Sequence, residues 1–429
     1  MRRVALGVAL SVFCGLGMSY APACAEVKVE ITPRIELGTE YDDNLYLESE
    51  DEQSDFIYTA SPAIVLDLVS EKGNLAFEYG PTFVRYQDHD ENNTVRHSGS
   101  LDFNRALSEH LDFAFSDTYL RSEDPLAESQ QVEEVEGVRE TRNVYQRNTS
   151  QASLSYRFGP ENVASGGLSH SWLENEDPEL DDSTVLSPFV NVTYWLDVQN
   201  GLGLHYTYTD ARFSVEDGEA QDDYTGHSMG IDYTRRFSKH TSGMVGYDYT
   251  TRDFDGDTSD YDVHNPWLGM THAFSPWTTV TAHVGYFFQE RDTGEDADGP
   301  SFDASLTRRF ERGNLSLAAQ GGWDEAFQEA EQRGFSQYWS VRAKGDYALQ
   351  ERLKGFAGLS YRMDMQEQEP ADQEWTTWRA DCGIDWSFWR WLSVRLSYAY
   401  TERDDDVDRD DYTDNRVMLT ITGSRLFRW

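Results

Sequence analysis

Hydrophobic and polar residues alternate along most of this chain with a period of two. Between residues 27 and 37, apolar side chains occupy the odd positions and mostly polar side chains the even ones. The same alternation recurs in residues 279–289, 341–347 and 392–401. A period of two places successive side chains on opposite faces of a β-strand. The pattern therefore predicts many strands, each with one apolar and one polar face.

Short turns divide the alternating segments at a nearly constant interval. From residue 160 onward the spacing is roughly 35 to 40 residues, within the range that marks a repeated supersecondary unit. Each unit fits a strand, a long acidic loop, a second strand and a short turn, and strands of about 10–14 residues are long enough to cross a membrane. Nine turns are predicted near Glu71, Glu109, Pro160, Gln199, Ser238, Pro276, Glu311, Glu351 and Arg390.

These units predict an all-β fold, a transmembrane antiparallel up-and-down β-barrel of about 20 strands. Its short turns would face the periplasm and its long acidic loops the exterior. A count of about 18 strands follows if the N-terminal segment folds otherwise, because Pro33 interrupts the first ladder. A soluble β-sandwich or propeller is the alternative. It is disfavoured because the polar strand faces carry charges, where a sandwich would bury apolar groups.

The first residues have the features of a secretory signal. Arg2 and Arg3 precede an apolar stretch from Val4 to Met18, and Ala23-Cys24-Ala25 supplies small residues for cleavage. We expect a signal peptide at residues 1–25, cleaved after Ala25, and a barrel domain at residues 26–429. With the signal removed only Cys382 remains, so no internal disulfide is expected.

The charge of the chain is strongly negative and is concentrated in the long loops. The formal net charge is −41, and residues 174–182 contain six acids and no base. Nucleic acid is therefore not expected as a partner. Three interpretations of the loops stay open: a solvated surface, diffuse binding of Ca²⁺ or Mg²⁺ that bridges to lipopolysaccharide, and a pore mouth that attracts cations. No discrete metal site and no cofactor are assigned.

The polar strand faces supply candidate pore-lining residues. They share the parity opposite the apolar face of their strands and would set the polarity and selectivity of a channel. They are Arg34, Glu36, Arg342, Lys344, Asp346, Arg362, Asp364, Arg379, Asp381 and Arg395. The third loop, residues 122–143, is the longest. It either folds inward and narrows the channel or stays exposed at the surface.

Aromatic residues are expected to mark the two membrane interfaces and the end of the chain. Tryptophans lie close to the short turns, as Trp277 does, and also toward the loop ends, as Trp267 does. Such girdles are typical of outer-membrane barrels. Phe427 and Trp429 at the C-terminus resemble the signal by which the barrel-assembly machinery recognises its substrates.

Catalytic machinery is not evident in the sequence. The ten histidines are scattered, and we find no metal-binding spacing, phosphate loop or nucleophile elbow. We therefore expect no enzymatic activity. The first strand begins close to the predicted cleavage site, so we expect no plug domain of the kind that precedes the barrel of TonB-dependent transporters.

Several short motifs carry a resemblance to a known family. Residues 32–37 (TPRIEL) lead into residues 41–47 (YDDNLYL), and the turns Leu107-Ser108-Glu109-His110 and Phe237-Ser238-Lys239-His240 recur. The chain resembles the putative β-barrel porin 2 group, including EpsL-type proteins encoded with exopolysaccharide biosynthesis genes. The resemblance implies a barrel associated with polysaccharide export and supplies no catalytic residues.

The expected function is that of a passive porin or conduit in the outer membrane of a Gram-negative cell. Expected partners are outer-membrane lipids and lipopolysaccharide, the assembly machinery and exopolysaccharide export components. The carboxylates would oppose passage of an anionic polymer. The alternative is a non-enzymatic surface or structural barrel that binds divalent cations through its acidic loops.

Overall fold

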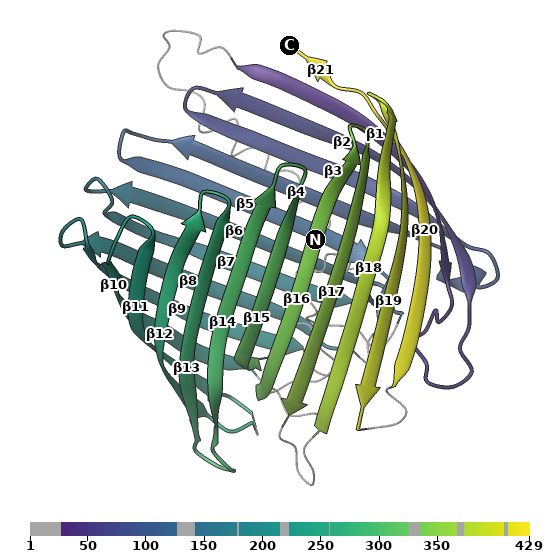
Figure 1. The fold of residues 1–429 in the computed structure, drawn as a ribbon. Helices are drawn as coiled ribbons and strands as arrows, with labels where there is room; N and C mark the ends of the chain where they lie inside the picture. Colours follow the sequence, from purple (N-terminus) through teal and green to yellow (C-terminus); the bar gives the residue numbers. More distant parts are fainter. Residues whose placement is uncertain are drawn as a thin grey trace.

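The computed structural model shows a closed antiparallel β-barrel (Figure 1). It describes residues 27–126, 142–177, 180–214, 223–256, 258–325, 335–366, 373–406 and 411–429. The predicted signal peptide and its cleavage site lie outside these residues. Each of the strands β1 to β20 pairs with the next, and β1 also pairs with β20, which closes the barrel. The prediction of 20 strands is confirmed.

The strands of the first half are β1 (Lys28–Asp42), β2 (Asp55–Ser70), β3 (Gly73–Tyr86), β4 (Thr94–Ala106), β5 (Leu111–Ser122), β6 (Tyr145–Arg157), β7 (Val163–Asn175), β8 (Asp182–Trp195), β9 (Asn200–Ser214) and β10 (Tyr224–Arg236). A short 3₁₀ turn, η1 (Asp90–Asn92), lies between β3 and β4.

The strands of the second half are β11 (Thr241–Phe254), β12 (Tyr261–Ser275), β13 (Thr278–Arg291), β14 (Ala297–Phe310), β15 (Gly313–Glu325), β16 (Phe335–Gln350), β17 (Leu353–Gln366), β18 (Gln373–Trp389), β19 (Leu392–Asp405) and β20 (Tyr412–Ser424). A two-residue strand, β21 (Phe427–Arg428), follows and pairs with the start of β1. The strands β1 to β20 are 12 to 17 residues long.

All nine predicted short turns lie at one end of the barrel, and the long connections lie at the other. Serine hydroxyls cap three of the turns, and in one of them Ser275 Oγ accepts a hydrogen bond from the backbone N–H of Trp277 (3.2 Å). Ser108 Oγ accepts hydrogen bonds from the backbone N–H groups of His110 (3.2 Å) and Leu111 (3.1 Å), and Ser238 Oγ accepts one from the N–H of His240 (3.1 Å). Serine is favoured in turns because its hydroxyl can satisfy nearby backbone donors.

Pro33 does not break the first strand. Its position in β1 is paired with Ile64 on β2. On the other side, pairing with β20 begins at Arg34 and pairing with β21 ends at Ile31. The missing N–H of the proline therefore falls at the gap between β20 and β21, where the ladder is already interrupted.

The registers define a wide and strongly tilted barrel. Following the residue pairs once around the ring returns to β1 about 24 residues from the starting point, and such a stagger in a 20-strand barrel corresponds to a strand tilt of about 40°. Barrels with fewer strands than this already enclose aqueous channels. The side chains of the strands alone therefore do not fill the lumen.

Apolar side chains cover the outer face. Ile35 and Leu37 on β1 lie beside Leu419 and Ile421 on β20, and all four are exposed. This belt is the surface that lipid would cover. Among the described residues, no helix is long and apolar enough to cross a membrane. Trp267 departs from the predicted girdle. It faces the lumen, where its Nε1–H donates to Asp248 Oδ2 at 2.8 Å.

The buried apolar residues gather inside the long-loop end. One cluster joins Tyr261, Val263, Phe287, Ala297 and Phe335. Smaller clusters surround Leu45 and Leu47 in the first loop. The core of this protein is thus a partial filling of one mouth of the barrel.

Candidate functional site

Contacts between strands that are not neighbours identify the lumenal face. Arg34 on β1 forms an ion pair with Glu78 on β3, and Arg362 on β17 reaches Asp324 on β15 at 3.0 Å. Such contacts pass over an intervening strand, which requires the concave side of a curved sheet. The residues that share the parity of these side chains therefore face the lumen.

The ten predicted pore-lining residues all lie on strands at this lumenal parity, and most have partners. Arg34 pairs with Glu78, and Glu36 accepts a hydrogen bond from Thr422 Oγ1 at 3.1 Å. Arg342 donates a hydrogen bond to Gln320, and Asp346 accepts one from Asn314 Nδ2 at 3.1 Å.

Two of the predicted arginines form ion pairs in the second half of the barrel. Arg362 pairs with Asp364 at 2.7 Å, and Arg395 pairs with Asp385 at 2.6 Å. Lys344 lies on β16, and Arg379 and Asp381 lie on β18. Their role in selectivity stays a prediction.

Eight of these residues form one arc of the lumen, which we call the charged wall. It comprises Arg342, Lys344 and Asp346 on β16, Arg362 and Asp364 on β17, Arg379 and Asp381 on β18, and Arg395 on β19. The wall holds five basic and three acidic side chains, and Arg362 pairs with Asp364 within it, so opposite charges lie close together and partly offset one another.

The opposite arc has a different chemistry, and we call it the hydroxyl wall. In a ring of 20 strands, β6–β9 lie across the lumen from β16–β19. Apart from Arg147 and Arg157 near the two ends of β6, the lumen-facing positions of these strands hold no Arg, Lys, Asp or Glu. Most carry hydroxyl or amide groups: Thr149, Gln151, Ser153, Ser165, Ser169, Ser171, Ser187, Asn191, Thr207 and Thr209.

A buried ionic cluster occupies the long-loop mouth beside the closure between β1 and β20. We call it the mouth cluster, and it comprises Asp42, Asp124, Arg142, Asp414 and Arg416, all less than 10% exposed. Arg416 contacts Asp414 at 2.7 Å, Asp124 at 3.1 Å and Asp42 at 3.4 Å. Arg142 contacts Asp42 at 3.3 Å.

The mouth cluster shows where the ends of the third loop lie. Asp124 and Arg142 come from the two ends of that loop, and both are buried against lumenal residues of β1 and β20. The adjacent Leu126 packs with Leu47 and Tyr412. Both described ends of the loop therefore fold inward. Residues 127–141 lie outside the described part of the chain.

The charge on Asp124 is held by its surroundings. Burial alone would raise the pKa of its carboxyl. The guanidinium groups of Arg416, Arg96 and Arg142 outweigh that effect and hold the pKa well below its usual range. Asp124 is thus an ionised anchor for the base of the third loop.

The motif Tyr41-Asp42-Asp43-Asn44 ties the first loop to the closure of the barrel. The Asn44 side chain is fully buried, and its Nδ2 donates to the backbone carbonyls of Glu48 (2.8 Å) and Thr413 (2.9 Å). The Asp43 carboxylate accepts hydrogen bonds from the backbone N–H (2.6 Å) and side-chain Nδ2 (2.9 Å) of Asn415. The motif therefore joins β1 to β20, at opposite ends of the sequence.

Leu47 completes this turn in a conformation that costs energy. Its φ of 56° lies in the left-handed region, which is unusual for a residue with a branched side chain. The packing of Leu47 against Leu126 and Tyr412 and the hydrogen bond from its N–H to the Asn44 carbonyl (3.2 Å) hold it there. The turn is therefore fixed by tertiary contacts.

A second group narrows the mouth on the side of β11–β16. Arg252 on β11 pairs with Glu325 at the end of β15 at 2.9 Å, and the Tyr261 hydroxyl donates to the same carboxylate. Phe335 packs edge-on against the Tyr261 ring, with centroids 5.7 Å apart. Three strands lie between β11 and β15, so the ion pair spans a chord of the lumen.

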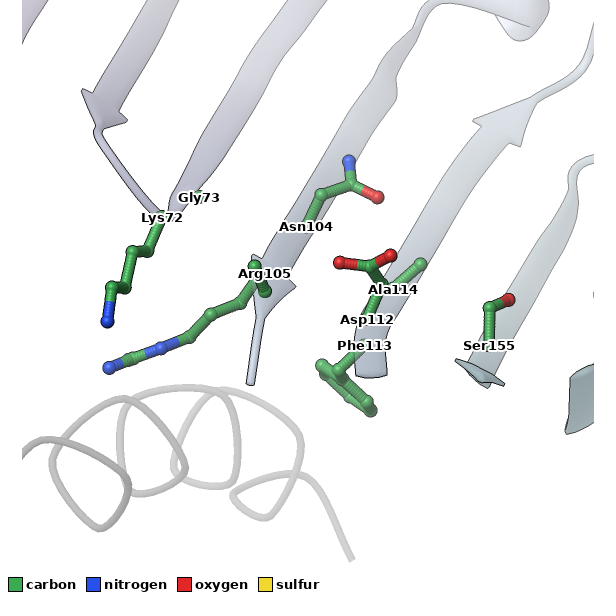
Figure 2. Close-up of a pocket in the computed structure, with 9 residues that line it drawn as sticks. Lys72, Gly73, Asn104, Arg105, Asp112, Phe113, Ala114 and Ser155 are labelled. Carbon is green, nitrogen blue, oxygen red and sulfur yellow. The ribbon is translucent and has the colours of Figure 1, made fainter. Parts of the chain in front are cut away.

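At the short-turn end, a pocket of about 240 Å³ lies against β3–β6 (Figure 2). Its lining includes Lys72, Asn104, Arg105, Asp112 and Ser155. The residues are polar and come from successive strands near their turns. The pocket presents no grouping of nucleophile, base and acid.

The mouth cluster was not predicted from the sequence. Arg416 and Asp414 share the lumenal parity of β20, which marks them as facing inward but does not reveal their partners. Arg142 and Asp124 lie in a loop, where alternation gives no information. The Tyr41–Asn44 motif carries the resemblance to a family, but its structural role depends on the pairing of β1 with β20, which the sequence does not show.

The predicted assembly residues lie at the short-turn end of β1. Phe427 and Trp429 stack with ring centroids 6.1 Å apart, and the Trp429 backbone exchanges hydrogen bonds with Val29. Trp429 is 69% exposed. An exposed aromatic at the barrel end is available for recognition, and that role stays a prediction.

One family model matches the second half of the barrel. Residues 268–425, which extend from within β12 to the end of β20, match the family described as Putative beta-barrel porin 2. A search of curated proteins gave no match.

Solved structures with a similar fold include three outer-membrane proteins. The siderophore receptor PirA from Pseudomonas aeruginosa has a TM-score of 0.52 and 9% identity, with 94% of this chain and 81% of that chain covered. A point mutant of the ferric enterobactin receptor PfeA from the same organism has a TM-score of 0.53 and 10% identity, with 94% of this chain and 82% of that chain covered. The copper transporter OprC has a TM-score of 0.53 and 8% identity, with 95% of this chain and 81% of that chain covered.

At these identities the likeness to solved structures concerns the fold alone. The apolar outer belt and the segment that matches the family model are the two observations that indicate the class of protein. Together, the closed barrel, its belt and the match of residues 268–425 indicate a porin-like β-barrel of the outer membrane.

Proposed function

We propose that this protein is a passive channel for hydrophilic solutes across the outer membrane. The observation that carries the proposal is the lumen, which has a charged wall on one side and a hydroxyl wall on the other. A barrel that served only as a scaffold would have no need of a polar lining this wide. Polar linings are typical of barrels that enclose water.

The acidic loops would give the channel a preference for cations. The charged wall carries both signs, five basic against three acidic side chains, so its charges partly offset one another. The unbalanced charge of the chain, −41 overall, is concentrated in the connections at the long-loop mouth. A mouth of one sign raises the local concentration of counter-ions.

The experiment is solute flux into liposomes containing the folded full-length protein. We expect neutral sugars to enter at rates that fall with increasing size, and monovalent cations to enter faster than anions of similar size. Liposomes that stay impermeable to the smallest sugar, with folded protein present, would contradict the proposal. They would favour the alternative of a structural barrel that binds cations through its loops.

Passage of an exopolysaccharide is the more specific form of this proposal, and the hydroxyl wall supports it. Rows of hydroxyl and amide groups can exchange hydrogen bonds with sugar hydroxyls without strong charge selection. The acidic mouth favours a neutral polymer over an anionic one. We expect neutral oligosaccharides to block the ion current transiently and uronic-acid oligomers of equal length to block it less. Equal or stronger block by the anionic oligomers would contradict this form.

A further inference from the structure

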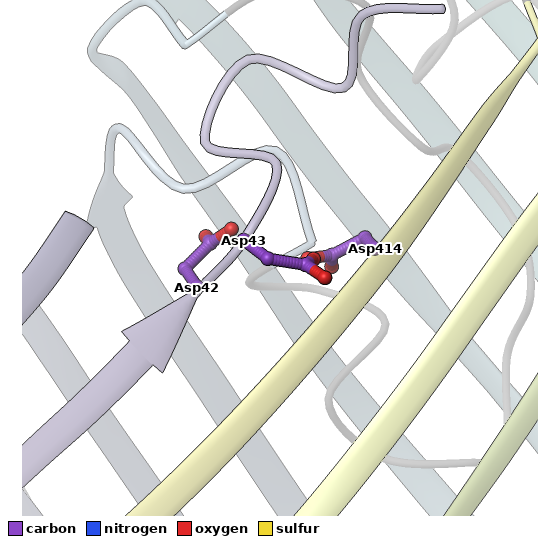
Figure 3. A group of neighbouring side chains, drawn as sticks. All are labelled: Asp42, Asp43 and Asp414. Atoms are coloured by element: carbon purple, nitrogen blue, oxygen red, sulfur yellow. The ribbon is translucent and has the colours of Figure 1, made fainter. Parts of the chain in front are cut away.

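Three aspartate carboxylates converge where the barrel closes (Figure 3). Asp42 is the last residue of β1, Asp43 begins the first loop, and Asp414 lies on the adjacent strand β20. One carboxylate oxygen from each residue lies within 4.8 Å of the other two. Asp42 is fully buried, Asp414 is 1% exposed and Asp43 is partly exposed.

One oxygen of this group lacks a partner. Asp414 Oδ2 accepts a hydrogen bond from Arg416 Nε at 2.7 Å, whereas Asp414 Oδ1 is buried with no hydrogen-bond donor among the described residues. Buried carboxylate oxygens are normally satisfied, because removing them from water without a replacement is costly. An unpartnered buried oxygen in a group of three converging carboxylates indicates a missing positive partner.

The surrounding charges do not balance. Among the described residues, Arg416 contacts the carboxylates of Glu40, Asp42, Asp124 and Asp414. The Arg142 guanidinium contacts the carboxylate of Asp42, and Arg96 contacts those of Asp124 and Glu123. Asp43 receives its hydrogen bonds from the neutral Asn415. The carboxylates therefore outnumber the guanidinium groups that touch them. A buried excess of negative charge requires a bound cation or proton.

We propose that Asp42, Asp43 and Asp414 bind a divalent cation of the calcium class. Carboxylate oxygens are hard ligands, and calcium tolerates irregular geometry and completes its shell with water. The three residues include no histidine or cysteine, the side chains that favour zinc or copper. Arg416 engages Oδ2 of both Asp42 and Asp414, which leaves Asp414 Oδ1 available.

A cation at this position would bridge β1 and β20. It would act beside the Asn44 hydrogen bonds and fix the start of the first loop at the closure of the barrel. This inference goes beyond conduction, because the site would exist whether or not the lumen carries solute. It also differs from diffuse binding by the loops, because it predicts one saturable site made of named residues.

The test is calorimetric titration of EDTA-treated, refolded full-length protein with CaCl₂, together with thermal unfolding in EDTA and in CaCl₂. The wild type should show one saturable site above a weak background and a higher unfolding temperature in CaCl₂. Asp414→Asn should lose the site and the rise in unfolding temperature. The matched control is Asp255→Asn, which removes an exposed loop acid and should keep both.

Asp43→Asn provides a second variant if Asp414→Asn fails to fold, because the Asp43 side chain is partly exposed. It should weaken calcium binding at least tenfold. The proposal is overturned if the wild type shows only the weak background, or if the aspartate variants retain the saturable site. The proposal is also overturned if the unfolding temperature of the wild type does not change with CaCl₂ but shifts with pH near neutrality. That result would indicate that the carboxylates share a proton.

Discussion

At the scale of single residues, Arg416 is the centre of the mouth cluster. It is 4% exposed and contacts four carboxylates from β1, β20 and the third loop. Removing one partner from a buried ion pair leaves uncompensated charge, which typically costs about 3–5 kcal/mol. Arg416→Ala should therefore lower the free energy of unfolding by about that amount.

Urea unfolding of the barrel in detergent, followed by tryptophan fluorescence, measures this effect. Arg395→Ala is the matched control, since its pair with Asp385 is half exposed and such pairs contribute about 1 kcal/mol or less. Equal losses in the two variants would mean that the mouth cluster is not a buried ionic centre.

Asp124 gives the mouth cluster a dependence on pH. Its folded pKa lies below the unfolded value of about 3.9, so it adds stability above that pH and the contribution is lost as pH falls through the folded pKa. Asp124→Asn should be less stable than the wild type at pH 7, and the gap should narrow between about pH 4 and pH 2. Unfolding midpoints across this range measure the gap.

The exposed Asp112, which pairs with Arg157 at 2.7 Å, provides the control for that series. Asp112→Asn should stay close to the wild type at every pH. A constant gap for Asp124→Asn down to pH 2 would show that its carboxylate is not held ionised by the arginines.

Strand parity can be read from the sequence, whereas the ion-pair partners of a side chain cannot. Arg34, Arg362 and Arg395 lie on the lumenal side because strand parity is a local property. Their ion pairs with Glu78, Asp324 and Asp385 depend on register, on curvature and on which strands are neighbours. Alternation along one strand contains none of that information.

At the scale of elements, the closure of the barrel depends on the turn after β1. Asn44 satisfies two backbone carbonyls, of Glu48 and Thr413, and is fully buried. Asn44→Ala should leave both carbonyls short of a donor and cost about 2–3 kcal/mol. Hydrogen exchange followed by mass spectrometry should show faster exchange at the β1–β20 seam and unchanged exchange at β10–β11.

Asn314→Ala is the control for the seam, because its bond to Asp346 is exposed. It should leave exchange at β1 and β20 unchanged. If hydrogen exchange in Asn44→Ala became faster by the same factor around the whole barrel, the residue would affect global stability and would not specifically stabilise the β1–β20 seam.

The elements themselves were largely predictable. All nine short turns were located because they interrupt the alternation at a nearly constant interval. The sequence predicts that Pro33 could disrupt the first strand, because it does not show that the ladder beside Pro33 is already interrupted. Trp267 was assigned to the outer girdle from its place in the strand, although its parity directs it into the lumen.

The last element, β21, carries a prediction about biogenesis. Phe427 and Trp429 stack at the short-turn end of the β1–β20 seam, and Trp429 is exposed. If these rings are the assembly signal, Trp429→Ala should reduce the folded, heat-modifiable form in outer-membrane fractions several-fold. The refolded variant should keep its stability in detergent. Trp277→Ala, which removes another exposed indole, should leave assembly unchanged.

At the scale of the whole molecule, the asymmetry of the lumen determines selectivity. Arg395→Ala removes a positive charge from the charged wall and leaves Asp385 without its partner. The ratio of cation to anion permeability should rise. The outward-facing Arg308, whose guanidinium lies over the Phe310 ring, is the control, and Arg308→Ala should leave the ratio unchanged. Equal ratios in both variants would contradict a charged permeation path along β19.

The most direct test of the account is the single-channel current of the folded full-length protein in a planar lipid bilayer. We predict stepwise current increments that increase in proportion to KCl concentration, with a reversal potential in a salt gradient that favours cations. A correctly folded barrel that inserts into the bilayer and carries no current would contradict the claim that its lumen is an open polar path.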